Sequence, residues 1–111
     1  MIEQEQFAEK IRQAGNAVRK AEEQACGMEA IEKRTFATLQ VEALGRGHKT
    51  VAAQTTYADA HEDMFEARLN RGVAKASIAA AKANLLAAEV EFKVWQTQMA
   101  TMRQEKRVYG S

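Results

Sequence analysis

The feature of this chain that most constrains its fold is a strict three–four spacing of apolar residues through its second half. Along that spacing only Arg71 and Lys106 are not apolar. Such a stripe is the seam of a coiled coil, and it passes Gly72 without losing phase. Residues 57–109 are therefore predicted to form one continuous helix, with a break at 70–72 as the less favoured alternative. The larger seam residues are Met64, Ile78, Leu85, Phe92, Trp95, Met99 and Met102.

Residues 2–44 carry a similar pattern and are predicted to form a first helix. The sequence contains no proline and is rich in Ala, Glu, Gln, Lys and Arg, which favours long helices. Its apolar face begins with Phe7, Ile11, Ala14, Val18, Ala21, Ala25 and Met28. After this run the pattern changes phase and continues through Ile31, Phe36 and Leu39.

The loop between the two helices is predicted to cover residues 45–56. Gly45 directly follows the first pattern, and glycine suits a helix C-terminal cap because the cap needs positive φ. Thr56, with Asp59 three residues later, has the spacing of a capping box at the start of the second helix. We therefore expect an all-α fold in which residues 1–111 form a single antiparallel, coiled-coil-like helical hairpin.

A second apolar stripe is displaced by two residues from the seam, which is about 200° around a helix. It consists of Leu69, Val73, Ala76, Ala80, Ala83, Ala87, Val90 and Val94. A two-helix hairpin needs one apolar face on each helix, and a helix that is apolar on both sides is normally buried on both. We therefore expect the hairpins to assemble into a helical homo-oligomer.

Composition restricts the class of protein. The net charge is +1, and the single cysteine, Cys26, cannot form an intramolecular disulfide, which fits a reducing compartment. The polar, acidic start MIEQEQ is unlike a signal peptide, and no apolar run approaches the roughly 18 residues of a membrane span. We expect a cytoplasmic protein that does not associate with membranes, in the host cytoplasm if a phage encodes it.

Two stretches resemble catalytic motifs but lack a required residue. In LGRGHKT, His48 stands before Lys49, where a phosphate-binding loop needs glycine, and no strand is predicted nearby. HEDMF begins at His61 like a zinc-protease helix, but Phe65 occupies the place of the second histidine. We therefore expect no catalytic residue, no metal, no cofactor and no enzymatic activity.

The C-terminal half, EARLNRGVAKASIAAAKANLLAAEVEFKVWQTQMATMRQEKRVYG, combines an apolar helix, a late tryptophan and a basic segment that closes on an aromatic residue. In these features it resembles the UvsY-like recombination mediators of phages. The resemblance implies an oligomeric helical protein that binds single-stranded DNA and helps to load a recombinase onto strands covered by single-strand-binding protein. That family has a Lys-Ala-Arg-Leu element tied to DNA contact. The nearest match here has Glu66 in place of the lysine, so Arg68 alone is carried over.

The candidate DNA contacts are basic residues of the loop and the second helix, which neutralise phosphates and are repeated in an oligomer. They are Arg46, Lys49, Arg68, Arg71, Arg103, Lys106 and Arg107. The last three lie in residues 101–111, which extend past the first helix and form either a docking tail or a frayed end. The alternative function is a non-catalytic coiled-coil interaction protein: a secretion stalk, a chaperone or a small inhibitor of a host enzyme.

Overall fold

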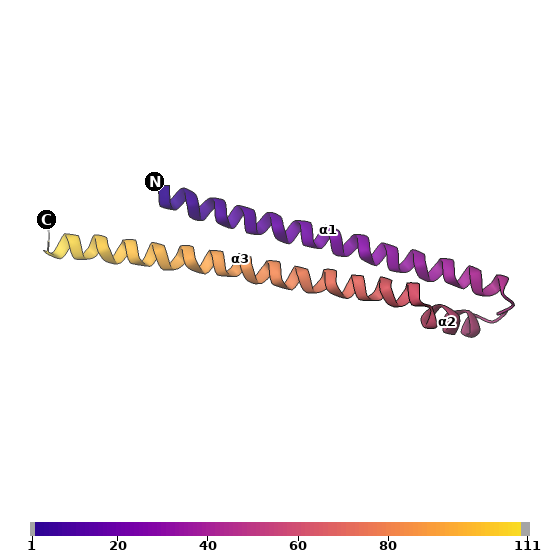
Figure 1. Ribbon diagram of the computed structural model, residues 1–111. Coiled ribbons are helices and arrows are strands. Elements are labelled where there is room, and N and C mark those ends of the chain that lie inside the picture. The colour runs from indigo at the N-terminus through magenta and orange to yellow at the C-terminus, as the bar shows by residue number, and fades with distance from the viewer. Residues whose placement is uncertain (1, 110–111) are drawn as a thin grey trace. The chain divides into compact units, whose positions relative to one another are not determined.

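The computed structural model describes residues 2–109, and throughout this range its regular structure is α-helical (Figure 1). Helix α1 (Ile2–Gly45) is joined by a short turn to α2 (Val51–Ala60), and α3 (Glu62–Tyr109) follows after one residue. The expected all-α fold is thereby confirmed. No helix within the described range is long and apolar enough to cross a membrane.

The chain packs as two compact units. The first, which we call the turn unit, is Arg19–Ala79 and contains the C-terminal part of α1, the turn, α2 and the beginning of α3. The second, which we call the terminal unit, combines Met1–Val18 with Ala80–Ser111 and so pairs the start of α1 with the remainder of α3.

The segments of α1 and α3 run antiparallel in each unit. In the turn unit the short turn after α1 reverses the chain. In the terminal unit Glu3 contacts Trp95, whereas Lys10, two turns further along α1, contacts Glu91, which comes earlier in α3. These arrangements confirm the predicted helical hairpin.

The seam predicted for the second helix is the packed face of α3. Every described α3 side chain that is buried or half-buried lies on that seam, between Met64 and Met99. The helix also passes Gly72 without a break, as predicted. The seam residues are Met64, Ala67, Arg71, Ala74, Ile78, Ala81, Leu85, Ala88, Phe92, Trp95 and Met99.

Met102 was expected on this seam, but its side chain is 58% exposed. The reason is the register of the terminal unit. Glu3, near the start of the described part of α1, already lies against Trp95, so the described α1 does not extend to Met102. The seam position predicted for Tyr109 lies outside the described side chains.

The seam of α1 keeps its phase through Leu39, past the place where a change was predicted, and then shifts by one residue so that Ala43 and not Glu42 is buried. Phe36 and Leu39 are packed as predicted. Glu32 and Thr35 continue the three–four spacing as half-buried residues, and Leu39 follows as a buried one. Ile31, by contrast, is 51% exposed. A charged residue fits on the seam because Arg71 of α3 faces it: the Glu32 Oε2 and Arg71 Nε atoms are 2.9 Å apart.

The turn uses a different glycine from the one predicted. Gly45 is the last residue of α1, and the positive φ, 98°, belongs to Gly47. The amide of Gly47 donates to the carbonyl of Leu44 at 3.1 Å, and the amide of His48 donates to that of Ala43 at 3.0 Å. This pair of hydrogen bonds is a Schellman motif, which satisfies the last carbonyls of a helix. The sequence GRG offers two glycines, and these hydrogen bonds use the second.

Helix α2 occupies most of the stretch predicted as a loop, so the boundaries 45–56 are wrong. Its N-cap is Thr50, whose Oγ1 accepts a hydrogen bond from the Ala53 amide at 3.1 Å. Thr56, the predicted cap, lies inside α2, where its Oγ1 donates to the Ala52 carbonyl at 3.0 Å. Helix α2 starts before the predicted cap because Thr50 already provides a cap, and residues 51–60 contain no glycine or proline.

A break at His61 separates α2 from α3, so the prediction of one helix over 57–109 is wrong at its start. The backbone of His61 is extended, with φ −77° and ψ 140°. Its amide donates to the Ala58 carbonyl at 3.1 Å, and its Nδ1 accepts a hydrogen bond from the Asp63 amide at 3.1 Å. One residue therefore closes α2 and opens α3.

The best-packed part of the turn unit lies where α2 meets α1 and α3. Leu39, Ala58 and Met64 form a buried cluster with one member from each helix. Phe36 and Tyr57 pack against it. The break between α2 and α3 lets Ala58 and Met64 face the same cluster although they are only six residues apart in sequence.

Two glycines give a matched test of the turn. Gly47→Ala forces a side chain into the left-handed region and is expected to lower the free energy of unfolding by about 1–2 kcal/mol. Gly72→Ala adds a methyl group inside α3, with nothing within 4 Å of it, and is expected to raise that free energy by roughly 0.5–1 kcal/mol. Urea unfolding followed by circular dichroism measures both. Effects of the same sign would contradict the role given to Gly47.

Candidate functional site

Arg71 and Glu32 form a charged pair within the seam of the turn unit. Their Nε and Oε2 atoms are 2.9 Å apart. Both atoms are buried, and neither has a hydrogen-bond partner among the described residues, so the ion pair is what offsets their desolvation. The Arg71 and Glu32 side chains are 41% and 15% exposed, which makes this pair the least solvated of the ion pairs in the described structure.

Arg68 extends this pair into a layer of four charges. Its Nη2 donates to Asp59 Oδ1 at 2.6 Å, and its Nε lies 4.0 Å from Glu32 Oε1. We call Glu32, Asp59, Arg68 and Arg71 the charged layer; its two acids and two bases cancel. Arg68 and Arg71, both candidate DNA contacts, are thus already engaged by carboxylates of their own unit.

The turn carries two further candidates, Arg46 and Lys49. The Nη2 of Arg46 lies 3.3 Å from Glu42 Oε1, and its Cζ lies 5.8 Å from the centre of the Tyr57 ring. An exposed pair of this kind is worth about 0.3–0.5 kcal/mol, so it is easily exchanged for another anion. Lys49 is exposed and forms no ion pair with any residue that the structure describes.

The histidines of the two incomplete motifs pack against Tyr57. The ring centroids of His48 and Tyr57 are 5.5 Å apart, and those of Tyr57 and His61 are 6.0 Å apart. The amide of the Gln54 side chain donates to the His48 carbonyl at 3.0 Å, which ties the turn to α2. Within residues 2–109, no group of three or more His, Cys, Asp or Glu side chains is arranged to hold a metal ion.

Three aromatic rings hold the helices of the terminal unit together. The Phe7 centroid lies 5.7 Å from that of Phe92 and 5.5 Å from that of Trp95. The Trp95 Nε1 donates to Glu3 Oε2 at 2.7 Å, so its polar atom is satisfied across the helix pair. A shallow groove beside the rings is lined by Phe7, Val90, Glu91, Val94, Trp95 and Gln98.

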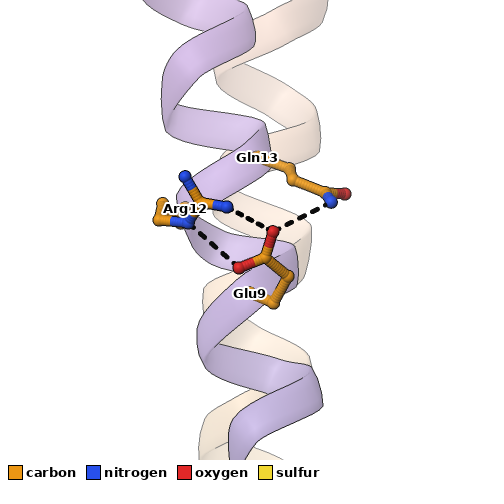
Figure 2. A network of polar contacts seen from close by, with 3 residues as sticks. All are labelled: Glu9, Arg12 and Gln13. Carbon is orange, nitrogen blue, oxygen red and sulfur yellow. Dashed lines mark hydrogen bonds and ion pairs between the residues drawn. The ribbon is translucent and has the colours of Figure 1, made fainter.

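An exposed network on α1 supports that helix from one side (Figure 2). The Arg12 Nε donates to Glu9 Oε2 at 3.0 Å, Arg12 Nη2 donates to Glu9 Oε1, and Gln13 Nε2 donates to the same Oε1 at 3.1 Å. The hydrogen bonds from Arg12 lower the pKa of the Glu9 carboxyl below its ordinary value and raise the pKa of Arg12. All three residues lie on α1 within one turn, so the network stabilises the helix locally.

The last three candidates lie on the part of α3 that the described α1 does not cover. Arg103, Lys106 and Arg107 are exposed and fall within about 100° of one another around the helix. Glu105 projects from nearly the opposite side, about 200° from Arg103. None of the three basic side chains forms an ion pair with the described residues. We call them the basic face of α3.

The second apolar stripe is exposed along α3, as its position opposite the seam implies. Its larger members, Leu69, Val73, Val90 and Val94, are 49–60% exposed. Its alanines are exposed as well. Burial of this stripe between copies of the chain stays a prediction.

The two acids of the charged layer, Glu32 and Asp59, were missed in the sequence. Glu32 and Arg71 each occupy a seam position, and their pairing follows once the two seams are aligned antiparallel. The available signal was the three–four spacing of α1, which includes Glu32 when no change of phase is assumed. Asp59 gave no such signal, because its place depends on the break at His61.

Comparison with known proteins gave no matching family model, no similar curated protein and no similar solved structure. The candidate surfaces therefore depend on the sequence and geometry of this chain.

Removal of the seam carboxylate tests the charged layer. Glu32→Ala leaves the buried Nε of Arg71 without its partner and is expected to lower the free energy of unfolding by about 1–3 kcal/mol. The control is Glu29→Ala, which removes an exposed pair with Lys33 and is expected to cost about 0.5 kcal/mol or less. Denaturant unfolding compares the two. Equal losses would show that the layer contributes no more than a surface ion pair.

The Glu9 network predicts a pH dependence with a definite sign. Because Arg12 lowers the pKa of Glu9, the interaction is present above the ordinary carboxyl pKa and is lost as the pH falls through the lowered value. Carbon-detected NMR titration of Glu9 is expected to give a lower pKa in the wild type than in Arg12→Gln. A Glu9 pKa that Arg12→Gln leaves unchanged would contradict the hydrogen bonds of Figure 2.

Proposed function

We propose that this protein is a non-catalytic, homo-oligomeric helical protein that binds single-stranded DNA through the basic face of α3. The observation that carries the proposal is the arrangement of Arg103, Lys106 and Arg107 on one exposed side of a helix. The single acid of this segment, Glu105, projects away from that side. Clustered lysine and arginine side chains of this kind neutralise the phosphates of a nucleic-acid backbone.

Concentration of basic residues on one face of α3 would allow a chain of low net charge to bind a polyanion. The net charge is +1, but several opposite charges elsewhere are paired with one another, as in the charged layer. Several copies of the basic face in one assembly would act together on one strand, because a linked second contact has a high effective concentration. Lys49 and Arg46 at the turn are auxiliary contacts in this proposal.

The resemblance to phage recombination mediators supports the same proposal and names its partners. By that resemblance the bound strand is one covered by single-strand-binding protein, and the assembly contacts a recombinase. The cytoplasm, or the host cytoplasm for a phage protein, is the compartment where these partners occur.

A second candidate is a protein-interaction module without nucleic-acid binding. It is favoured by the ion pairs of Arg46, Arg68 and Arg71, which neutralise three of the seven candidate DNA contacts. The exposed apolar stripe of α3 suits either candidate. The two candidates differ in one measurable property, which is salt-dependent binding of an oligonucleotide.

The test is fluorescence anisotropy of a labelled oligothymidylate at low and moderate salt. We expect binding at micromolar protein that weakens as salt rises, because bound phosphates release counterions. The triple variant Arg103→Glu, Lys106→Glu and Arg107→Glu is expected to weaken binding by about tenfold or more and to reduce the salt dependence.

The matched control makes the same change of charge elsewhere, with Lys20→Glu, Arg34→Glu and Lys82→Glu, all of which are exposed. Circular dichroism verifies that both variants keep their helices. Equal weakening by the two triple variants would assign binding to net charge and not to the basic face. Absence of salt-dependent binding by the wild type would leave the protein-interaction module as the function.

A further inference from the structure

We infer that the exposed face of α3 in the terminal unit packs antiparallel against the same face of a second copy, about a two-fold axis near Ala87. The face consists of Ala80, Ala83, Leu86, Ala87, Val90 and Val94. This inference rests on the homo-oligomer of the proposed function and identifies one of its interfaces.

The terminal unit buries very little by itself. Among its described side chains Ala88 alone is buried, whereas its seam aromatics are half-buried. On the outer side of α3, Leu86 is 61% exposed, and Val90 and Val94 are 49% and 51% exposed. Covering these three side chains provides apolar burial that the helix pair lacks.

The chain exposes more surface than a compact monomer of its mass. The accessible surface of the chain is 8403 Å². A compact monomer of 12.3 kDa exposes about 6,100 Å², so the chain exposes about 2,300 Å² more. A standard interface buries about 800 Å² on each partner. The surplus, which belongs to the whole chain, is larger than one partner's share of such an interface.

The distribution of side-chain size along the face identifies the partner as a second copy. Apart from Leu86, which lies at one edge of the face beside the axis, its N-terminal half is made of small residues, Ala80, Ala83 and Ala87, and its C-terminal half carries the larger Val90 and Val94. In an antiparallel pair the valines of each copy lie over the alanines of the other. Such a face is complementary to itself under a two-fold rotation.

The flanking charges agree with this orientation. Glu91 lies beside the C-terminal half of the face, and Asn84 occupies the same flank beside its N-terminal half. An antiparallel pair therefore places each Glu91 beside an uncharged residue of the partner. Lys82 and Lys93 lie on the other flank, about 100–120° from the middle of the face, and both are exposed.

Disulfide cross-linking tests both the surface and the orientation. Cys26, which is exposed, is first replaced by serine, and single cysteines are then introduced at positions 80, 87 and 94. Under mild oxidation Ala87→Cys is expected to cross-link to itself. Ala80→Cys and Val94→Cys are each expected to remain uncross-linked alone and to cross-link when mixed, because positions 80 and 94 face one another.

Self-cross-linking of Ala80→Cys and Val94→Cys would overturn the antiparallel arrangement. Absence of every cross-link would overturn the interface. If no cross-link forms, light scattering of the wild type shows whether the chain assembles at all. A multimeric mass would assign assembly to another surface, and a monomeric mass would remove assembly from the proposed function. The anisotropy experiment tests DNA binding and the cross-linking experiment tests the interface, so failure of one proposal can be told from failure of the other.

A charge substitution provides the second readout. Val90→Arg places a cation within the face and is expected to reduce the mass seen by light scattering to that of the monomer. The control, Ala17→Arg, changes an exposed alanine of α1 in the same unit and is expected to leave the mass unchanged. Both positions are exposed, so circular dichroism should show the helices intact. A multimeric mass for Val90→Arg would overturn the proposal.

Discussion

The packing of alanine-rich seams is the constraint on which the rest of this structure depends. Of the seven buried side chains in the described range, five are alanine. Alanine lets two helices approach closely but removes little apolar area from water. Larger side chains therefore pack at a few places, such as Leu39 and Met64 beneath α2 and Phe7 against Trp95. Several other large apolar residues of α3, such as Val73, Leu86 and Val90, lie exposed on its outer side, which is why assembly features in the proposed function.

Alanine seams also leave the register between two helices weakly specified, because one alanine packs much like another. Each unit contains a feature that distinguishes one register from the next. In the turn unit Glu32 must meet Arg71, since a slip would leave a half-buried carboxylate without a cation. In the terminal unit the indole of Trp95 must reach Glu3. We interpret these polar contacts as determinants of register more than as sources of stability.

Periodicity predicted the fold because it depends on residues along a single helix. The packed positions of α3 between Met64 and Met99 follow directly from it. What failed were choices between similar local signals: Gly45 against Gly47, and Thr56 against Thr50. Those choices depend on which hydrogen bonds form, and the break at His61 depends on its extended backbone and on an imidazole that accepts a backbone amide. The seven candidate contacts were chosen by charge, and Arg68 also by the resemblance, without regard to carboxylate partners. The partner of Arg46 is local, four residues earlier in the chain, whereas those of Arg68 and Arg71 depend on tertiary contacts and could not be anticipated.

The hydrogen bond between Trp95 and Glu3 makes the single tryptophan of the chain an optical reporter of the terminal unit. Its indole is half-buried beside Phe7, so separation of α1 from α3 in this unit would hydrate the ring and move its emission to longer wavelength. Far-ultraviolet circular dichroism reports all three helices together. A difference between the two signals would thus separate opening of the helix ends from loss of the turn unit, within the unmodified protein.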